Sequence, residues 1–330
     1  MARSKTLNEQ IGFLVAILTA ACLAGCMPQE SAIGHFDRTF TVNGPVRLEL
    51  ANGSGDSRIN AGSSGVVEIH AEVRAHAWSW RNAQRRLQEI EANPPVSQDS
   101  NLIRVGESNW RWGDISASYN YTITVPADAE VQAVAGSGSL RVNGVQGPAN
   151  FVVGSGSISA TGIAKDTEAI VGSGNIRMAD MGGEIDVTAG SGSVHIDRAK
   201  GEIRARAGSG EISIREPGDT VVAQAGSGGI EVTGATADLR LRTASGEIRV
   251  DGNPGATNFW DLHAASGGVT LRVPHDASFR LYAHTGSGNI DVGVPSVSEE
   301  SSGRHEYQGR IGDGKARVEI ETASGGVSLR

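Results

Sequence analysis

Apolar and polar residues alternate along most of the chain, and the alternation returns at regular intervals. Each interval contains two aliphatic residues around one polar residue, such as Ile176 and Met178 around Arg177, and a second alternating set such as Ile185 and Val187. Alternation with a period of two indicates short strands with one buried face. The first aliphatic position is occupied by Leu140, Ile158, Ile176, Val194, Ile212, Ile230, Ile248, Val269, Ile290 and Val327.

A Gly-Ser-Gly triplet sets the period of the chain. It returns at a constant 18-residue step, beginning at Gly136, Gly154, Gly172, Gly190, Gly208 and Gly226. An Ala-Ser-Gly variant follows after the same step at Ala244, and further triplets begin at Ala265, Gly286 and Ala323 after longer steps of 21, 21 and 37. The later coils therefore carry insertions, and Gly53-Ser54-Gly55 is an earlier, irregular member.

Two short strands per repeat predict an all-β fold, a single-stranded parallel β-helix or β-solenoid, whose coils stack in register and bury apolar residues against their neighbours. Ten coils would span roughly 50 Å. We favour right-handed winding, and the cross-section could be two- or three-sided. A left-handed hexapeptide helix needs an aliphatic residue where this chain has Gln146, Gly182 and Lys200, which excludes it.

Outward charges test this stacking, because like charges on neighbouring strands destabilise a sheet. In-register coils place residues of opposite charge side by side in the pairs Asp197 and Arg215, Glu231 and Arg249, and Asp186 and Arg204. The step from Glu168 to Asp186 breaks this pattern.

The remaining segments differ from the repeat. Residues 40–130 predict N-terminal strands and a cap, with a helix inserted at about 79–92 and a strand from Tyr121 to Pro126. Residues 131–330 form the solenoid repeats, with a polar insertion at about 295–314 that we expect to be an exposed loop. No cap is evident after the last repeat, so that end could pair with another chain.

The N-terminal residues predict the cellular localisation of the protein. Arg3 and Lys5 precede an apolar run from Ile11 to Leu23, which is typical of a secretory signal peptide over residues 1–25. The run ends in Leu23-Ala24-Gly25-Cys26, which resembles the lipobox of bacterial lipoproteins. This resemblance implies cleavage before Cys26, acylation of its thiol and, because Met27 rather than Asp follows, export to an outer membrane. An ordinary signal peptide with a chance cysteine is the alternative. Residues 26–39 would then be a tether.

Composition narrows the classes of function. The net charge is −8, and removing Arg3, Lys5 and Glu9 takes away a net +1 and leaves −9, which argues against nucleic acid as a partner. Cys22 leaves with the signal peptide and Cys26 would be lipidated, so no disulfide is expected. Gly is 45 of 330 residues and Pro only 10, which excludes collagen and a proline-rich linker.

The repeat, the early Asn52-Gly53-Ser54-Gly55, the inserted helix and the Tyr121–Pro126 strand together resemble the bacterial "putative adhesin" family, a domain of unknown function. The resemblance covers about residues 40–330. It implies a β-solenoid at the cell envelope and brings no catalytic residues with it.

The sequence favours no enzymatic chemistry, metal or cofactor. A serine that recurs in ten triplets indicates a structural ladder in which each hydroxyl satisfies turn backbone, and the glycine after it predicts a positive φ. Phosphate-loop and calcium-repeat patterns are absent. The eight His residues are scattered; His70 and His76 are the closest pair.

Two sets of residues are candidates for binding. One is an outward strand face composed of His195, Asp197, Arg215, Glu231, Arg249 and Asp251. The other is the aromatic set Trp78, Trp80, Trp110 and Trp112, in which each pair would share a strand face and either cap the solenoid or contact sugar rings or a protein.

We therefore expect a non-enzymatic, lipid-anchored adhesion or interaction scaffold of the bacterial envelope, on the periplasmic or surface side, with the membrane and an envelope glycan or protein as partners. The alternatives are a carbohydrate-active β-helix that uses Glu231 and Asp197, and an envelope signalling accessory.

Overall fold

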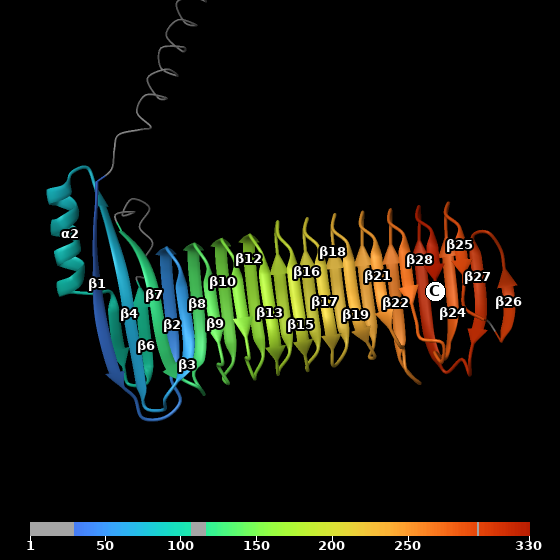
Figure 1. Ribbon diagram of the computed structural model, residues 1–330, viewed down its shortest axis with the longest axis horizontal. Coiled ribbons are helices and arrows are strands. Elements are labelled where there is room, and N and C mark those ends of the chain that lie inside the picture. Colours follow the sequence, from blue (N-terminus) through green and yellow to red (C-terminus); the bar gives the residue numbers. More distant parts are fainter. Residues whose placement is uncertain (1–29, 107–116, 296) are drawn as a thin grey trace, which may run out of the picture.

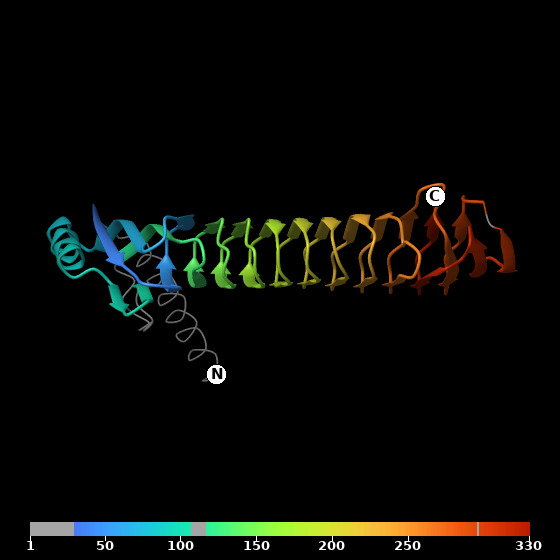
Figure 2. The same cartoon turned by 90° about the horizontal axis from the view of Figure 1, so that it is seen from below.

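The computed structural model of the protein describes residues 30–106, 117–295 and 297–330. Here the chain forms a rod of two long sheets, one of 14 and one of 15 strands, with a helix at one end (Figure 1). Figure 2 shows the sheets as two layers joined by corners. The predicted β-solenoid is confirmed and is two-sided, whereas its right-handed winding stays a prediction. Signal peptide 1–25 and Cys26 lie outside the described residues.

Within the described residues, twelve coils stack along the rod, and each contributes one strand to each sheet. From the N-terminal end of the rod they are β6 (Leu102–Gly106) with β7 (Ala117–Pro126), β2 (Arg47–Ser54) with β3 (Ser57–Gly62), β8 (Glu130–Ser137) with β9 (Leu140–Asn143), β10 (Ala149–Ser155) with β11 (Ile158–Thr161), β12 (Thr167–Ser173) with β13 (Ile176–Met181), β14 (Ile185–Ala189) with β15 (Val194–Ala199), β16 (Ile203–Ala207) with β17 (Ile212–Pro217), β18 (Val221–Ala225) with β19 (Ile230–Ala235), β20 (Leu239–Thr243) with β21 (Ile248–Gly252), β22 (Phe259–Ala264) with β23 (Val269–Arg272), β28 (Ala316–Thr322) with β29 (Val327–Leu329), and β24 (Phe279–Thr285) with β25 (Ile290–Val292).

The repeat stacks in the predicted register. Ile176 lies between Ile158 and Val194 on parallel neighbouring strands, each of them one repeat away in sequence. All three side chains are fully buried, so the aliphatic rows form one continuous narrow core between the sheets. Such a core is stabilised only by neighbouring coils, as in other stacked repeats.

The glycine that ends each triplet is needed mainly because the adjacent coil approaches its backbone closely, and less because of its φ angle. Gly138, Gly156 and Gly174 have φ of 116°, 155° and 144°, but the corresponding glycines from Gly192 onward do not have positive φ, so that expectation is wrong for most coils. Along the whole ladder, a Cβ at this position would lie under 3.0 Å from the carbonyl oxygen of a residue in the adjacent rung.

The triplet serines are stacked as predicted, with Ser155 between Ser137 and Ser173. Their hydroxyls do not satisfy turn backbone as expected. Among the ten triplets, only the Ser287 hydroxyl donates a described hydrogen bond to backbone, 3.4 Å to the carbonyl of Ala323. The hydroxyls lie on the exposed corner of the rod, where water can satisfy them.

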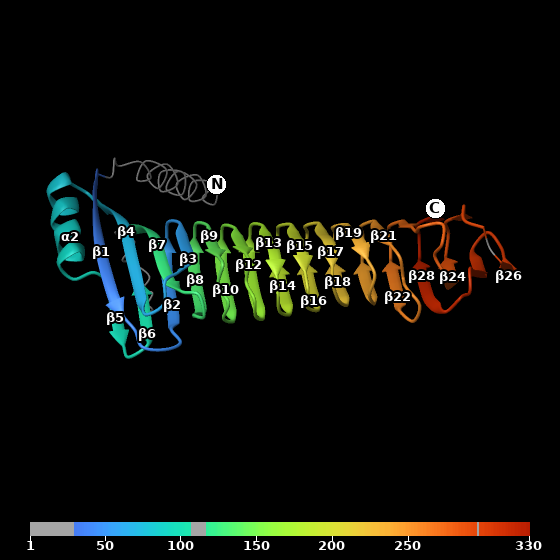
Figure 3. The same ribbon diagram turned by 60° about the horizontal axis from the view of Figure 1, so that its bottom comes forward.

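Coil order is exchanged at both ends of the rod. Coil β2–β3 lies between β6–β7 and β8–β9, and coil β28–β29 lies between β22–β23 and β24–β25 (Figure 3). The expectation of an uncapped final repeat is therefore wrong, because Val327–Leu329 pairs with a strand on either side. The first coil also begins before residue 131, since β2 and β3 pair directly with β8 and β9.

The N-terminal cap contains the predicted helix, α2 (Trp80–Ala92), which begins after Ser79 as N-cap. Past the end of the 15-stranded sheet, the other sheet continues through β4 (Val66–Ala77) and β1 (Glu30–Thr41), and α2 packs on these two strands. Leu87 of α2 faces Gly34 of β1, where a Cβ would lie under 3.0 Å from it. A short strand, β5 (Val96–Asp99), ends the 15-stranded sheet.

Two predicted irregular segments are strands. The tether expected over 26–39 is wrong in its described part, because Glu30–Thr41 is β1, which pairs antiparallel with β4 and buries Ala32 and Phe36. The expected loop at 295–314 is also wrong, because β26 (Ser298–Ser302) and β27 (Glu306–Ile311) extend the 15-stranded sheet antiparallel beyond β24. Tyr307 and Ile311 are buried there and cover the C-terminal end of the core.

Candidate functional site

The candidate face predicted from the sequence lies on the outer face of the 14-stranded sheet, on β15, β17, β19 and β21. Its residues form two rows that cross neighbouring strands. One row is His195, Ser213, Glu231 and Arg249, and the other is Asp197, Arg215, Thr233 and Asp251.

The register of opposite charges is as predicted, but the ion pairs are different. Asp197 pairs with the adjacent Arg198 rather than with Arg215, and Arg249 pairs with Glu247 rather than with Glu231. The outward residues thus make local contacts at the corners and leave Arg215 without an ion pair within 4 Å in the described chain.

Arg198 is the most constrained charge on this face. Its guanidinium lies 2.6 Å and 3.1 Å from the two carboxylate oxygens of Asp180 in the preceding coil. This hydrogen bond holds the pKa of Asp180 below its ordinary value and, with the nearby carboxylates, raises the pKa of Arg198. Both residues have positive φ, 56° and 53°, at a corner where neighbouring coils have Gly144 and Gly162.

The structure divides the predicted face. A shallow groove of about 320 Å³ is lined by Arg177, His195, Asp197 and Arg215, but Glu231, Arg249 and Asp251 lie outside it. Glu231 and Asp197, the carboxylates of the enzymatic alternative, are on β19 and β15 with β17 between them. Two strand spacings and the two-residue offset between their rows place their backbones roughly 12 Å apart, whereas the two carboxyl groups that cleave glycosides are about 5 to 9.5 Å apart.

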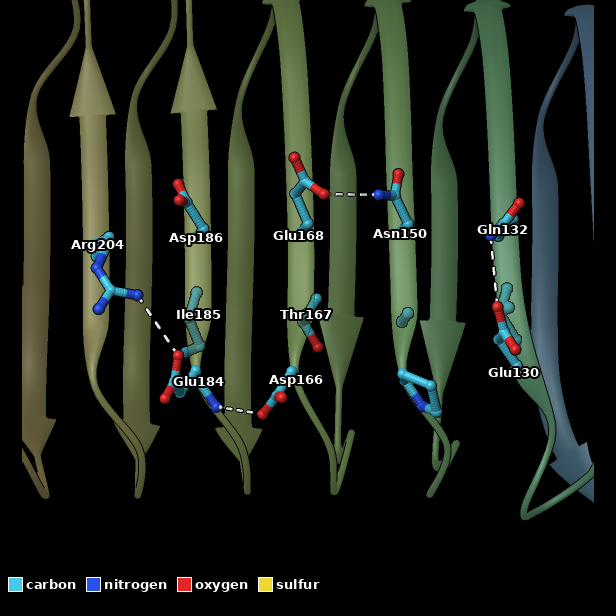
Figure 4. A pocket seen from close by; sticks show the side chains of 13 residues that line it. Glu130, Gln132, Asn150, Asp166, Thr167, Glu168, Glu184, Ile185, Asp186 and Arg204 are labelled. Carbon is cyan, nitrogen blue, oxygen red and sulfur yellow. Dashed lines mark hydrogen bonds and ion pairs between the residues drawn. The ribbon is translucent and has the colours of Figure 1, made fainter.

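A second groove, of about 440 Å³, lies on the outer face of the 15-stranded sheet and was not predicted (Figure 4). Its carboxylates come from adjacent coils, and each is restrained by a polar neighbour, Glu130 by Gln132 and Asp186 by Arg206 among them. The Asn150 amide donates to Glu168 at 2.7 Å, the Glu184 backbone N–H donates to Asp166 at 3.0 Å, and Arg204 donates to Glu184 at 3.4 Å. The groove is therefore acidic, with Glu130, Asp166, Glu168, Glu184 and Asp186 against Arg204.

An exposed aliphatic row runs beside this acidic groove. Val134, Val152 and Ile170 are direct neighbours on β8, β10 and β12 and point outward. Val134 is 46% exposed and Ile170 is 40% exposed. The signal in the sequence was consecutive apolar residues, such as Phe151-Val152-Val153, where strict alternation would place a polar residue. We refer to these three side chains as the aliphatic row.

The aromatic candidates are exposed. Trp78 is 79% and Trp80 is 52% exposed, so the alternative in which this pair is buried and caps the solenoid is wrong. They do not share a strand face, because Trp78 follows β4 and Trp80 begins α2. Trp110 and Trp112 lie outside the described residues.

Three arginines are adjacent at the far end of the rod. Arg280 on β24 lies between Arg317 on β28 and Arg310 on β27, all on the outer face of the 15-stranded sheet. The guanidinium of Arg317 lies 5.0 Å from the ring centroid of Tyr282 and 5.9 Å from that of Phe259. Like the Glu168–Asp186 and Asp261–Glu319 neighbours, this row places residues of the same charge side by side.

Among residues 30–106, 117–295 and 297–330, no group of three His, Cys, Asp or Glu side chains is arranged to hold a metal ion. Over the same residues, no helix has the length and apolar character needed to cross a bilayer.

Comparison with models of protein families shows which family the chain belongs to. The model of the family described as Toastrack DUF4097 matches residues 107–225 and again residues 220–330, which together are more than half of the chain. The chain belongs to this Toastrack family. The two matches divide the Toastrack rod within β18, in the middle of its regular coils. A comparison with curated proteins found no significant match.

Solved structures similar to this Toastrack chain come from several bacteria. One from Parabacteroides distasonis, described as a "putative lipid binding protein", is 13% identical with a TM-score of 0.41 over 92% of this chain and 97% of its own. A "putative cell adhesion protein" from Clostridium sporogenes is 11% identical with a TM-score of 0.25, over 92% of this chain and 99% of its own. A "putative adhesin" from Bacteroides fragilis is 12% identical with a TM-score of 0.29, over 90% of this chain and 97% of its own.

Proposed function

We propose that this Toastrack protein is a lipid-anchored, non-enzymatic interaction scaffold of the bacterial cell envelope. The observation that carries the proposal is the aliphatic row, three outward side chains on a sheet face beside a row of carboxylates. Contiguous exposed apolar side chains with a polar rim are typical of binding surfaces.

The lipobox supports the envelope address. Acyl chains on Cys26 would hold an acidic protein at a membrane that repels it electrostatically, and two or more chains give stable anchoring. Mass spectrometry of the mature N-terminus, with fractionation of Cys26→Ser cells, tests this part. An unmodified Cys26 would contradict the anchor.

The interaction surface is tested with a photo-crosslinking residue at position 152, in the middle of the aliphatic row. We expect crosslinks to one envelope component in living cells, and their loss when Ile170→Glu places a charge beside the probe. A probe at Arg177, on the outer face of the other sheet, is the matched control. Equal crosslinking from both positions would contradict a specific surface.

Turnover would contradict the non-enzymatic part of the proposal. Purified protein incubated with envelope polysaccharides should release no fragments above those released by an Asp197→Asn, Glu231→Gln double variant. Fragment release by the unaltered protein alone would show an enzyme.

A further inference from the structure

The N-terminal end of the rod has the properties of a membrane-docking surface. Trp78 and Trp80 are 79% and 52% exposed beside the start of the first strand. Tryptophan is enriched at membrane–water interfaces, because its ring is apolar and its indole N–H is polar. Two such exposed rings at one corner of the rod suit a partner with this mixed character.

The pairing of β1 with β4 fixes where the lipid would be. Glu30 lies directly opposite Ala77, so the first residue of β1 is next to the residue that precedes Trp78. Cys26 is four residues before Glu30, and four extended residues span at most roughly 14 Å. An acyl chain on Cys26 would therefore hold this corner within the depth of the headgroup region.

The local charge is complementary to an anionic membrane. Residues 73–88 contain four arginines and no acidic residue, in a chain of net charge −8. Arg74, Arg81 and Arg85 of this segment are exposed. Glu30, Glu89 and Glu91 lie at the same end of the rod, and Glu89 pairs with Arg86. Against these three carboxylates the four arginines leave this end with a net charge of +1, and each basic side chain near an anionic surface contributes about 1 kcal/mol of attraction. The end is therefore weakly attracted to the membrane while the acidic body is repelled.

We infer that the Trp78–Trp80 corner docks onto the anionic lipid headgroups and, with the Cys26 anchor, stands the rod away from the membrane. The inference rests on the proposed lipid anchor and adds an orientation to it. In this orientation α2 faces the bilayer (Figure 1), and the acidic groove, the aliphatic row and the arginines of β24, β27 and β28 face away from it or sideways.

The test uses the mature chain from Cys26, which then has a single thiol because Cys22 belongs to the signal peptide. The thiol is coupled to a maleimide lipid in vesicles of phosphatidylcholine and phosphatidylglycerol, in a background of Trp110→Phe and Trp112→Phe. Trp260 remains as an internal reference, since it is fully buried and its indole N–H donates to the Ala237 carbonyl at 2.7 Å.

We expect brominated lipids to quench the emission of Trp78 and Trp80 and to leave that of Trp260 unchanged. Trp78→Ala with Trp80→Ala should lose all quenching while Trp260 emission stays native. If aqueous iodide quenches the emission of Trp78 and Trp80 as strongly after coupling as before it, the inference is overturned.

The height of the protein layer on a supported bilayer gives an independent measurement. Fourteen strands at the usual spacing give an upright rod of roughly 60 Å. We expect this height for the coupled protein and a lower layer for the double Trp variant, whereas Val134→Ala with Ile170→Ala, which also removes exposed apolar groups, should leave it unchanged. A low layer for the unaltered protein would overturn the inference. Because the lipid is attached chemically, these results do not depend on whether cells acylate Cys26.

Discussion

The first and last residues of each triplet differ in how closely the adjacent coil approaches them. The first position is Ala in three coils, at Ala244, Ala265 and Ala323. The last position is Gly in every triplet, because the carbonyl oxygen of an adjacent rung occupies the space of a Cβ. The triplet therefore encodes the tightest approach between coils at a single residue.

We expect Gly210→Ala to destabilise the protein by about 3 kcal/mol, since the added methyl group cannot be accommodated without moving backbone. Gly208→Ala, two residues away in the same triplet, should cost less than Gly210→Ala, because its added Cβ would lie 2.4 Å rather than 1.9 Å from a carbonyl oxygen of the preceding coil and three other coils carry Ala there. Chemical denaturation of the two variants makes the comparison. Equal losses would show that close approach is not the reason for the glycine.

The Asp180–Arg198 pair predicts a dependence on pH. A carboxyl whose pKa is lowered in the folded state contributes stability above its unfolded pKa, and this contribution is lost as the pH falls through the folded pKa. Asp180→Asn should therefore lower the unfolding midpoint at pH 7, and the difference should vanish as the pH falls below about 4.

Thermal unfolding of the two proteins across this range measures the difference. Asp251→Asn is the matched control, because Asp251 is an outward residue of the same sheet without an ion pair in the described structure. A difference between wild type and Asp180→Asn that persists at pH 2 would contradict the role of the ionised pair.

At the scale of elements, parallel strands repeat every outward residue at a short spacing, so like charges accumulate unless the sequence alternates them. The longest of the exceptions is on β27, β24 and β28, where Arg310, Arg280 and Arg317 are adjacent. In the described structure, Arg280 has no ion pair to offset this repulsion, whereas Arg317 pairs with Glu319.

Arg280→Glu should stabilise the fold by about 0.5–1 kcal/mol, because it places a negative charge between two positive ones. The gain should decrease in high salt. Arg177→Glu is the control, since its neighbours on adjacent strands are Ser159 and His195. Urea denaturation at low and high salt measures both variants, and a loss of stability in Arg280→Glu alone would contradict the repulsion.

At the scale of the whole molecule, the order of the coils along the rod differs at both ends from their order in the sequence. The last strand in the chain, β29, is bonded on both sides, whereas β25 and β26 are the outer edges of the two sheets. The strands that close the C-terminal end thus come from the segment before the last repeat.

Hydrogen exchange should reveal this order. Backbone amides of β28 and β29 should exchange as slowly as those of the middle coils, although they are the last strands of the chain, because exchange requires opening of the strands that flank them. Amides of β25 and β26 should exchange fastest among the C-terminal strands. Exchange followed by mass spectrometry checks this, and fast exchange in residues 317–329 would contradict the order.

The sequence by itself determined the coil. The constant step of the triplets, the alternation around Arg177 and the recurring glycine are local properties of each repeat, and each limits the backbone to two strands and a tight corner. The helix at 79–92 was also predictable, because Leu87 and Ile90 follow a helical period and Pro94 stops it.

Only the tertiary structure decided which coils are neighbours and which outward residues are exposed together. Backbone hydrogen bonds between parallel strands do not depend on side chains, so one coil fits against another almost equally well, and the exchanged ends are chosen by their caps and connections. The same reason explains the candidate sites. The sequence placed His195 and Glu231 in one row, but the groove, the aliphatic row and the exposed Trp78 depend on what the neighbouring coils and α2 leave uncovered.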